Sequence, residues 1–267
     1  MTMKIKLYIN FATLAVRSVM MHRTSFIVGC IGQFLGYGAS FLATYMMISN
    51  FNIIGGWTAS QVLYLYGFNL LGYALAACVF FNPSRNLANK VRSGELDLSL
   101  TKPVHPLSHE LLTGFNPGYV NHLCLSVLTM AITAKDAGFP FTVGSVILWL
   151  IMLLSAALIH GALLLLTSAG GFLFIRNNPI GMITDIGKQF VEYPITIYPK
   201  LVQILLTFVL PYAFLNFYPV AAILNLEMTP PYLRIVAYFT PVMGCAILAI
   251  GIRVWNVCLS RYQSTGN

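Results

Sequence analysis

The chain has 267 residues, of which 58% are hydrophobic and 8% are charged, and it carries a net charge of +8. Soluble domains contain about a quarter charged residues, so this composition excludes an ordinary globular protein. A positive net charge can indicate a nucleic-acid binder, but no basic face with base-reading or stacking groups is visible in the sequence. The composition therefore predicts an integral membrane protein that contacts lipid and binds no nucleic acid.

Residues 1–23 predict an amphipathic helix. Lys6, Asn10, Thr13 and Arg17 recur at helical spacing and form one polar stripe, while the other faces are apolar. Such a helix lies in the membrane interface or packs on the protein itself, and the two alternatives are compatible. A short apolar core followed by a small-residue cleavage site is missing, so we do not expect a cleavable signal peptide.

Long intervals without charge predict six membrane spans. A span needs about 20 apolar residues to cross about 30 Å of hydrocarbon. No Asp, Glu, Lys or Arg occurs from Thr24 to Ser84, which is long enough for two spans and a turn. The predicted spans cover residues 24–48, 59–81, 115–134, 143–171, 201–224 and 235–256.

The positions of the basic residues predict the topology. If the N-terminus, residues 82–114, residues 172–200 and the C-terminus share one side, only Lys135 and Arg234 of the 15 lysines and arginines fall on the other side. Cytoplasmic loops carry the excess of basic residues, so both termini are predicted to be cytoplasmic. In the first span, Gly32 and Gly36 are four residues apart and predict a helix contact, within the chain or between subunits.

Residues 82–114, here called the insert, hold seven of the chain's 22 charged residues between Arg85 and Glu110. We predict a helix from Pro83–Ser84 to Ser93, ended by Gly94. The two prolines that follow predict an extended stretch before a last helical piece. The insert either presents a docking surface to a soluble subunit or is a solvated loop whose charges enforce topology.

Two further segments depart from simple spans. Residues 172–200, with Arg176, Asp185, Lys188 and Glu192, predict a second cytoplasmic segment. Residues 214–234 are too apolar for a simple loop and contain three prolines, so a broken or re-entrant hairpin is predicted between the fifth and sixth spans, on the outer side.

No catalytic or metal-binding constellation is predicted. The five cysteines occur singly and predict packing residues. The stretch HELLT has Thr113 where a zinc-protease motif needs its second histidine, and His122 and His160 are isolated in predicted spans. Ionisable groups are also missing from the predicted span centres, which argues against an ion-driven pump. If the protein transports, we expect its energy to come from a partner.

Three stretches together resemble a known family, namely RSGELDLSLTKPVHPL (92–107), LPYAFLNFYPVAAILN (210–225) and WNVCLSRYQSTGN (255–267). The chain is similar to the permease subunits of ABC-2-type exporters, in the subgroup of short, six-span bacterial permeases. One departure is Lys102, where the family often has Arg before its proline. The residues that carry the resemblance are Gly94, Leu96, Asp97, Leu100, Pro103 and Pro106 in the insert, with Trp255, Arg261, Tyr262, Ser264 and Gly266 at the C-terminus.

The resemblance implies one transmembrane domain over residues 1–267, with an elbow helix (1–23), a coupling helix in the insert and a cytoplasmic tail (257–267). It also implies a bacterial cytoplasmic membrane location. Two permease subunits, identical or related, would each rest on one ATPase subunit, which would bind ATP and magnesium. The permease itself would hold no cofactor and no catalytic residue. The implied coupling residues are Arg85, Lys90, Arg92, Gly94, Glu95, Leu96, Asp97 and Pro103.

By the same resemblance, the second and fifth spans would line a pathway for an amphipathic substrate. Tyr64, Tyr66, Asn69 and Tyr73 make the second span suitable for this, although a packed helix face explains them equally well. The alternative function is a standalone channel or carrier that ATP does not drive. A membrane enzyme ranks below both, because no acid–base pair or nucleophile constellation is present.

Overall fold

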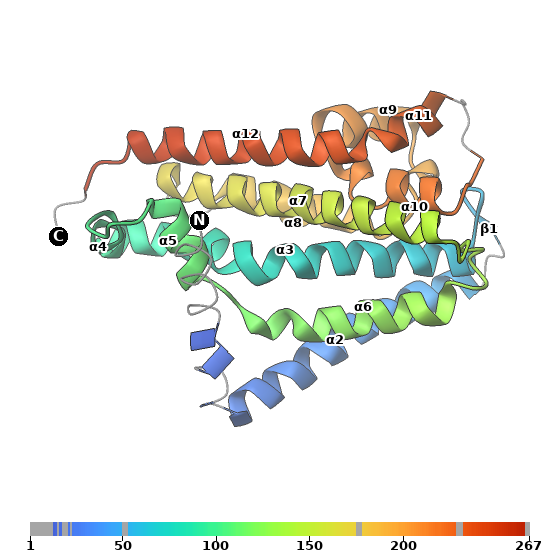
Figure 1. Cartoon of the computed structure of the whole chain (residues 1–267), viewed down its shortest axis with the longest axis horizontal. Helices are drawn as coiled ribbons and strands as arrows, with labels where there is room; N and C mark the ends of the chain where they lie inside the picture. The colour runs from blue at the N-terminus through green and yellow to red at the C-terminus, as the bar shows by residue number, and fades with distance from the viewer. Residues whose placement is uncertain are drawn as a thin grey trace.

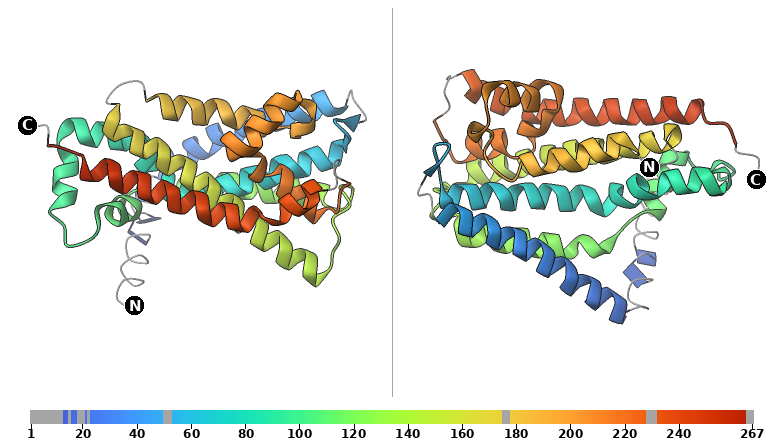
Figure 2. Two further views of the ribbon diagram at one scale, coloured as in Figure 1. Left: turned by 90° about the horizontal axis from the view of Figure 1, so that it is seen from above. Right: turned by 180° about the vertical axis from the view of Figure 1, so that it is seen from behind.

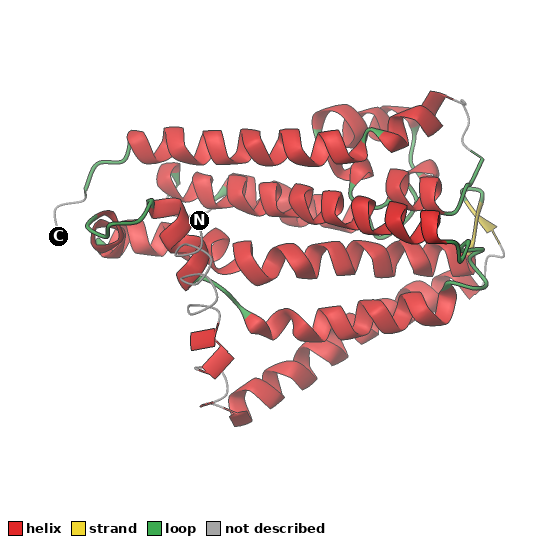
Figure 3. Cartoon of the chain, in the orientation of Figure 1, coloured by secondary structure: helices red, strands yellow, loops and turns green. Residues whose placement is uncertain are grey.

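The computed structural model describes residues 13–14, 16–17, 21, 23–49, 53–174, 178–227 and 232–264. Of these residues 81% are helical, and the long helices lie side by side in one bundle (Figures 1 and 3). The prediction of an all-α protein is confirmed. The interfacial helix predicted over residues 1–23 lies almost wholly outside the described residues, so it stays a prediction.

The first two long helices are joined by a short hairpin. Helix α2 (Arg23–Ser49) leads to strands β1 (Ile53–Ile54) and β2 (Trp57–Thr58), which pair antiparallel, and α3 (Ala59–Ser93) follows. A capping box starts α3, because the Thr58 hydroxyl accepts from the Gln61 backbone N–H and the Gln61 side chain accepts from the Thr58 N–H. We call this end of the bundle the hairpin end.

Helix α3 is longer than the predicted second span and continues through Pro83. The prediction that a new helix starts at Pro83–Ser84 is therefore wrong. A proline inside a helix removes one backbone hydrogen bond, and two carbonyls of this stretch accept bonds from outside the helix. Ser168 donates to the Pro83 carbonyl at 3.1 Å, and the Asn116 N–H donates to the Cys78 carbonyl at 2.8 Å.

The predicted end of this helix is confirmed, because Gly94 has a φ of 72° and caps α3. A short helix, α4 (Glu95–Leu100), follows directly, and α5 (Pro106–Thr113) begins after a non-helical stretch that contains Pro103. Figure 1 shows α4 and α5 together at one end of the bundle, near the C-terminus. We call this the insert end.

The third predicted span is only partly helical. Helix α6 (Val120–Thr133) has 14 residues and follows a 3-10 turn, η1 (Pro117–Tyr119). At about 1.5 Å per residue this is about 21 Å, which is shorter than the hydrocarbon layer. Helix α7 (Val143–Leu173) matches the predicted fourth span and starts at a Thr142 cap.

Helix α8 (Pro179–Phe190) corrects the prediction for residues 172–200. It starts at the insert end, where the Asn178 amide donates to the Thr167 carbonyl at 2.7 Å. It then runs back along the bundle (Figure 2), and the Thr196 hydroxyl donates to the Gly55 carbonyl at the hairpin end. The segment therefore does not stay at the end that carries α4 and α5, as its charges had predicted.

The predicted fifth span is not one helix. It consists of α9 (Lys200–Ile204), the π-turn η3 (Leu205–Val209), the 3-10 turn η4 (Pro211–Phe214) and α10 (Phe217–Ile223). The chain bends by 72° between Val209 and Pro211. Leu210 is extended there, as is typical of a residue before proline. The observed bend therefore lies inside the segment assigned to the span and before residues 214–234, so the hairpin predicted there stays a prediction.

The last helices are α11 (Tyr232–Tyr238) and α12 (Thr240–Ser260), and α12 packs along α7. Gly244 permits this contact, because a Cβ atom there would lie 2.9 Å from the Ser155 carbonyl oxygen. Among the described residues, four helices (α2, α3, α7 and α12) are long and apolar enough to cross a membrane, and five if the bent pair counts as one span.

Candidate functional site

The insert end is held together by the buried carboxylate of Glu110. This side chain is 2% exposed and accepts hydrogen bonds from the Lys90 ammonium at 3.0 Å and the Ser99 hydroxyl at 2.9 Å. These residues come from α3, α4 and α5, so one carboxylate ties three helices together. A buried charge needs such partners. The sequence predicted Lys90 as a coupling residue but gave no signal for Glu110, whose partners lie 11 and 20 residues away.

A small apolar core lies beside this network and joins the insert to the long helices. Leu96 of α4 is fully buried in it. Trp255 of α12 is also fully buried, and its indole N–H donates to the Ser168 hydroxyl of α7 at 3.2 Å. A movement of α4 must therefore displace groups packed on α7 and α12. The buried apolar residues of this core are Leu87, Val91, Leu96, Leu107, Leu165, Ala169 and Trp255.

Helix α4 also has exposed side chains. Leu98, on the side opposite Leu96, is 64% exposed, and Leu100, at the end of the helix, is 43% exposed. The Glu95 carboxylate at the start of the same helix is also exposed. Of the other predicted coupling residues, Arg92 and Pro103 are also exposed. The structure thus brings most of the predicted coupling residues to one end of the bundle, where α4 has a buried side and a free side.

The C-terminal tail also contacts α4. The Ser264 hydroxyl donates to the Asp97 carboxylate at 2.6 Å, and the Tyr262 ring packs against Phe172. Burial, and then the nearby Asp97 carboxylate, raise the pKa of the Tyr262 phenol. An internal motif and the C-terminal motif, 167 residues apart at this contact, therefore meet at the insert end.

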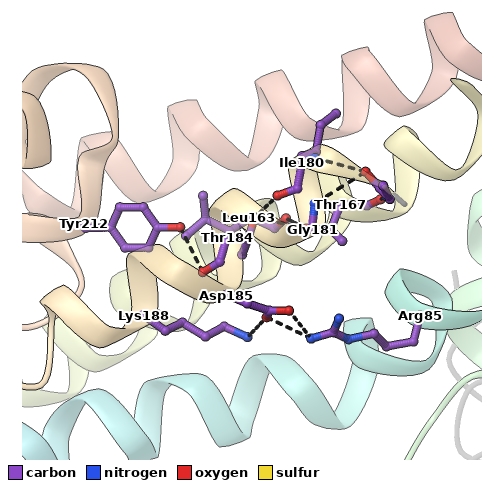
Figure 4. Close-up of polar contacts among 10 residues, drawn as sticks. Arg85, Leu163, Thr167, Ile180, Gly181, Thr184, Asp185, Lys188 and Tyr212 are labelled. Atoms are coloured by element: carbon purple, nitrogen blue, oxygen red, sulfur yellow. Dashed lines mark hydrogen bonds and ion pairs between the residues drawn. The ribbon is translucent and has the colours of Figure 1, made fainter. Parts of the chain in front are cut away.

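Arg85 does not belong to this surface. It forms a charged cluster with Asp185 and Lys188 of α8 (Figure 4). One guanidinium nitrogen, Nη2, donates to both Asp185 oxygens at 2.8 and 2.9 Å, and the Lys188 ammonium donates to the same carboxylate at 3.2 Å. Lys188 also lies 4.7 Å from the centre of the Tyr73 ring, inside the predicted second span.

The charged cluster brings ionisable groups against the second predicted span, although none of them lies within a predicted span. The sequence prediction placed Asp185 and Lys188 in a loop, whereas α8 places them beside α3. The single carboxylate of Asp185 partners both cations, as charges packed between helices require.

The other side of α8 is fixed by close packing. The Thr184 and Thr167 hydroxyls share a hydrogen bond of 3.1 Å, and the Tyr212 hydroxyl donates to the Thr184 carbonyl at 3.3 Å. A Cβ atom at Gly187 would collide with the Tyr212 ring. Figure 4 shows Tyr212 and the charged cluster on opposite sides of α8, so the packing holds the cluster toward α3.

The four predicted pathway residues are placed in different surroundings. Tyr64 packs near Phe139, and the Tyr66 hydroxyl donates to a backbone carbonyl of α2. Asn69 lies within hydrogen-bond distance, 3.1 Å, of His160, and the Tyr73 ring packs edge-on against the same histidine. The three tyrosines are buried in the chain. Their role in a pathway stays a prediction.

His122 joins the aromatic residues near Tyr73. Its ring lies 4.1 Å from that of Tyr37 and 4.9 Å from that of Tyr119. The structure therefore brings both histidines of the predicted spans to Tyr73, although the sequence left them isolated. No group of three or more His, Cys, Asp or Glu side chains among the described residues could hold a metal ion.

The glycine pair in α2 has no partner helix within the described part of the chain. A Cβ atom at Gly32 or Gly36 would meet nothing within 4 Å. Figure 1 shows α2 diverging from α3 and α6 toward the insert end. A contact through these glycines within one subunit is therefore not formed, and the contact between subunits stays a prediction.

A bundle of long apolar helices with a helical insert at one end defines a multi-pass membrane protein. A family model described as "ABC-2 family transporter protein" matches residues 34–266, and the chain belongs to this family of transporter permeases. Such permeases are membrane transport components that normally work with an ATPase subunit and are generally not catalytic themselves. No curated protein and no solved structure matches the chain.

Proposed function

We propose that the chain is one permease subunit of an ATP-driven exporter for an amphipathic substrate. It would pair with a second permease, identical or related, and each permease would dock on one separate ATPase subunit that binds ATP and magnesium. Family membership supports the class of protein. The observation that carries the proposal is that α4 buries Leu96 in the core while Leu98, on its opposite side, and Leu100, at its end, are exposed.

A helix that is buried on one side and exposed on the other can transmit a conformational change from a partner to the core. An ATPase that closes on ATP binding would push on the exposed side of α4. Because Leu96 and Glu110 tie α4 to the core and to α3, the push would reach the long helices rather than only bend a loop. The exporter would then alternate between two states to which the ATPase binds differently.

The proposal includes six crossings of a bacterial cytoplasmic membrane, with the insert end and both termini in the cytoplasm. Helix α8 with the residues after it would form the fifth crossing, in place of residues 201–224. The bent segment from Lys200 to Ile223 would re-enter the membrane from the hairpin end. Moving Lys200 to the outer side leaves most basic residues on the cytoplasmic side, which agrees with the positive-inside rule.

The test is purification of the chain from its native membranes in mild detergent. We expect a soluble P-loop ATPase to co-purify in a constant ratio. Deletion of the insert is a poor variant, because Leu87 and Leu96 belong to the core. The double substitution Leu98→Glu and Leu100→Glu is a more specific test, because it changes only exposed side chains. We expect it to release the ATPase.

Val143→Glu is the matched control, because Val143 is an exposed apolar residue at the start of α7, near the hairpin end. It should leave the ATPase bound. A chain that purifies alone, or only with copies of itself, would contradict the proposal and favour a channel or carrier that ATP does not drive.

A further inference from the structure

The charged cluster carries one positive charge in excess. Arg85 and Lys188 share the single carboxylate of Asp185. Glu192, the next acidic residue along the chain, forms no ion pair with either cation among the described residues. The Arg85 guanidinium uses only its Nη2 atom for Asp185, although arginine has five N–H donors. The cluster can therefore take a further acceptor of negative charge.

The cluster is accessible from one side. The side chains of Arg85 and Asp185 are 42% and 43% exposed in the isolated chain, and both lie between α3 and α8. A charged face of this kind is unfavourable against lipid tails, because an excess charge there has no partner. It is favourable where a bound group supplies the missing negative charge.

Apolar side chains surround the cluster. The Arg85 guanidinium lies 5.4 Å from the Phe81 ring, and Lys188 lies over Tyr73. Along α8, Met182 lies one turn before Asp185 and Ile186 directly follows it, and both apolar side chains are exposed. A ligand that fits has an anionic head for the two cations and an apolar tail for these neighbours.

We propose that Arg85 and Lys188 bind the phosphate or carboxylate head of an anionic amphiphile, which is the cargo of this permease. Arginine is suited to this role because its planar guanidinium binds a phosphate or carboxylate through two parallel hydrogen bonds. Asp185 holds the two cations in place while the site is empty and competes with the head for them. The assignment as cargo rests on the proposed permease function, whereas the binding itself does not.

The first experiment measures binding to the full-length chain in nanodiscs of neutral phosphatidylcholine. The probes are decyl phosphate, decyl maltoside, decyltrimethylammonium and inorganic phosphate. We expect decyl phosphate to bind saturably and at least about tenfold more tightly than the neutral and cationic probes, since a hydrogen bond to a charged group contributes about 1.5–3 kcal/mol. Inorganic phosphate should bind far more weakly, because it has no tail.

Equal affinity for the neutral and anionic decyl probes would overturn the proposal. Equal affinity for inorganic phosphate and decyl phosphate would overturn the amphiphile as the ligand class.

Substitutions of the three charged residues test whether the cations favour decyl phosphate binding and the carboxylate opposes it. Arg85→Gln and Lys188→Gln should each weaken decyl phosphate binding about tenfold or more. Asp185→Asn should strengthen it, because both cations lose their competitor. Arg253→Gln, which removes a cation from α12, is the matched control and should leave the affinity unchanged. If Asp185→Asn weakens binding as much as the cation variants do, the cluster is a structural ion pair and the proposal is wrong.

A folding defect in one variant leaves the test intact. A monodisperse elution profile would identify the variants that fold. Lys188→Gln should lower the affinity for decyl phosphate and Asp185→Asn should raise it. Either variant, compared with Arg253→Gln, therefore tests the proposal without the other.

The cargo assignment is tested in the complex purified with its ATPase. Decyl phosphate should stimulate ATP hydrolysis by the wild-type complex and not by the Arg85→Gln complex. Binding without stimulation, in a complex that hydrolyses ATP, would overturn the cargo assignment. If no ATPase co-purifies, the proposed function fails while the binding result stands, so the two failures are distinguishable.

Discussion

The Asp97 carboxylate accepts a hydrogen bond of 2.6 Å from the Ser264 hydroxyl, across 167 residues of sequence. This contact joins α4 to the C-terminal tail. The tail in turn packs through Tyr262 on Phe172, whose ring contacts Trp255 at 5.3 Å. Residues of the internal motif and of the C-terminal motif, which both carried the family resemblance, thus form one continuous contact at the insert end.

Ser264→Ala should weaken the coupling between α4 and the tail. We expect ATPase turnover in the permease–ATPase complex to change severalfold, while overall stability falls by less than about 1 kcal/mol, because the hydrogen bond is exposed. The measurement is ATP hydrolysis by the purified complex. Ser260→Ala is the control, since its hydroxyl bonds only to the Val257 carbonyl of its own helix. The prediction is wrong if both variants have the same effect.

Reversing the acidic charges of α4 should uncouple the permease from its ATPase. In the double variant Glu95→Lys and Asp97→Lys we expect loss of ATPase stimulation with normal membrane insertion, because both carboxylates lie on α4 at the proposed docking surface. The measurement combines membrane fractionation with ATP hydrolysis. Asp136→Lys, an exposed charge reversal near the hairpin end, is the control. Unchanged stimulation in a normally assembled double variant would contradict the prediction.

Glu110→Ala should destabilise the insert end. It leaves the Lys90 ammonium and the Ser99 hydroxyl without their partner. Breaking a fully buried ion pair costs about 3–5 kcal/mol, and we expect less here, because the Lys90 side chain is 21% exposed. The measurement is the thermal unfolding midpoint in detergent. Glu227→Ala, at an exposed glutamate, should leave the midpoint unchanged, and an equal shift in both variants would refute the assignment.

Gly187→Ala should disturb the packing of α8 on η4. The added methyl group would collide with the Tyr212 ring, and overpacking of this kind costs about 1–3 kcal/mol. Gly144→Ala is the matched control, since a Cβ there meets no atom within 4 Å. The measurement is the thermal unfolding midpoint of both variants. Adding Tyr212→Ala to Gly187→Ala should recover part of the lost stability. Equal stability of Gly187→Ala and wild type would show that α8 packs differently.

The direction of α8 predicts which side of the membrane Lys200 faces. In a variant without native cysteines, a membrane-impermeant thiol reagent should label Lys200→Cys from the same side as Ile53→Cys. It should label Lys102→Cys only from the opposite side. Thr196 contacts Gly55, which is why residues near 200 belong to the hairpin end. Labelling of Lys200→Cys together with Lys102→Cys would restore the topology that the charge pattern had predicted.

Local residue patterns were enough to predict the class of protein and most of the long helices. Apolar intervals identified α2, α7 and α12 close to their observed bounds, because the hydrophobicity needed to enter a membrane is a local property. Gly94 marked the end of α3, since a left-handed backbone conformation there favours glycine. These signals depend only on neighbouring residues, so no knowledge of the fold was needed.

The position of α8 and the partners of its charges depend on contacts between residues far apart in the sequence. Asp185 and Lys188 read as loop residues because each alone is too polar for a span. The residue that pairs with Asp185 is Arg85, 100 positions away, and the buried carboxylate of Glu110 likewise draws its partners from two other helices. A charge is tolerated inside a helix bundle when a partner offsets its desolvation, and the fold, not the local sequence, supplies that partner.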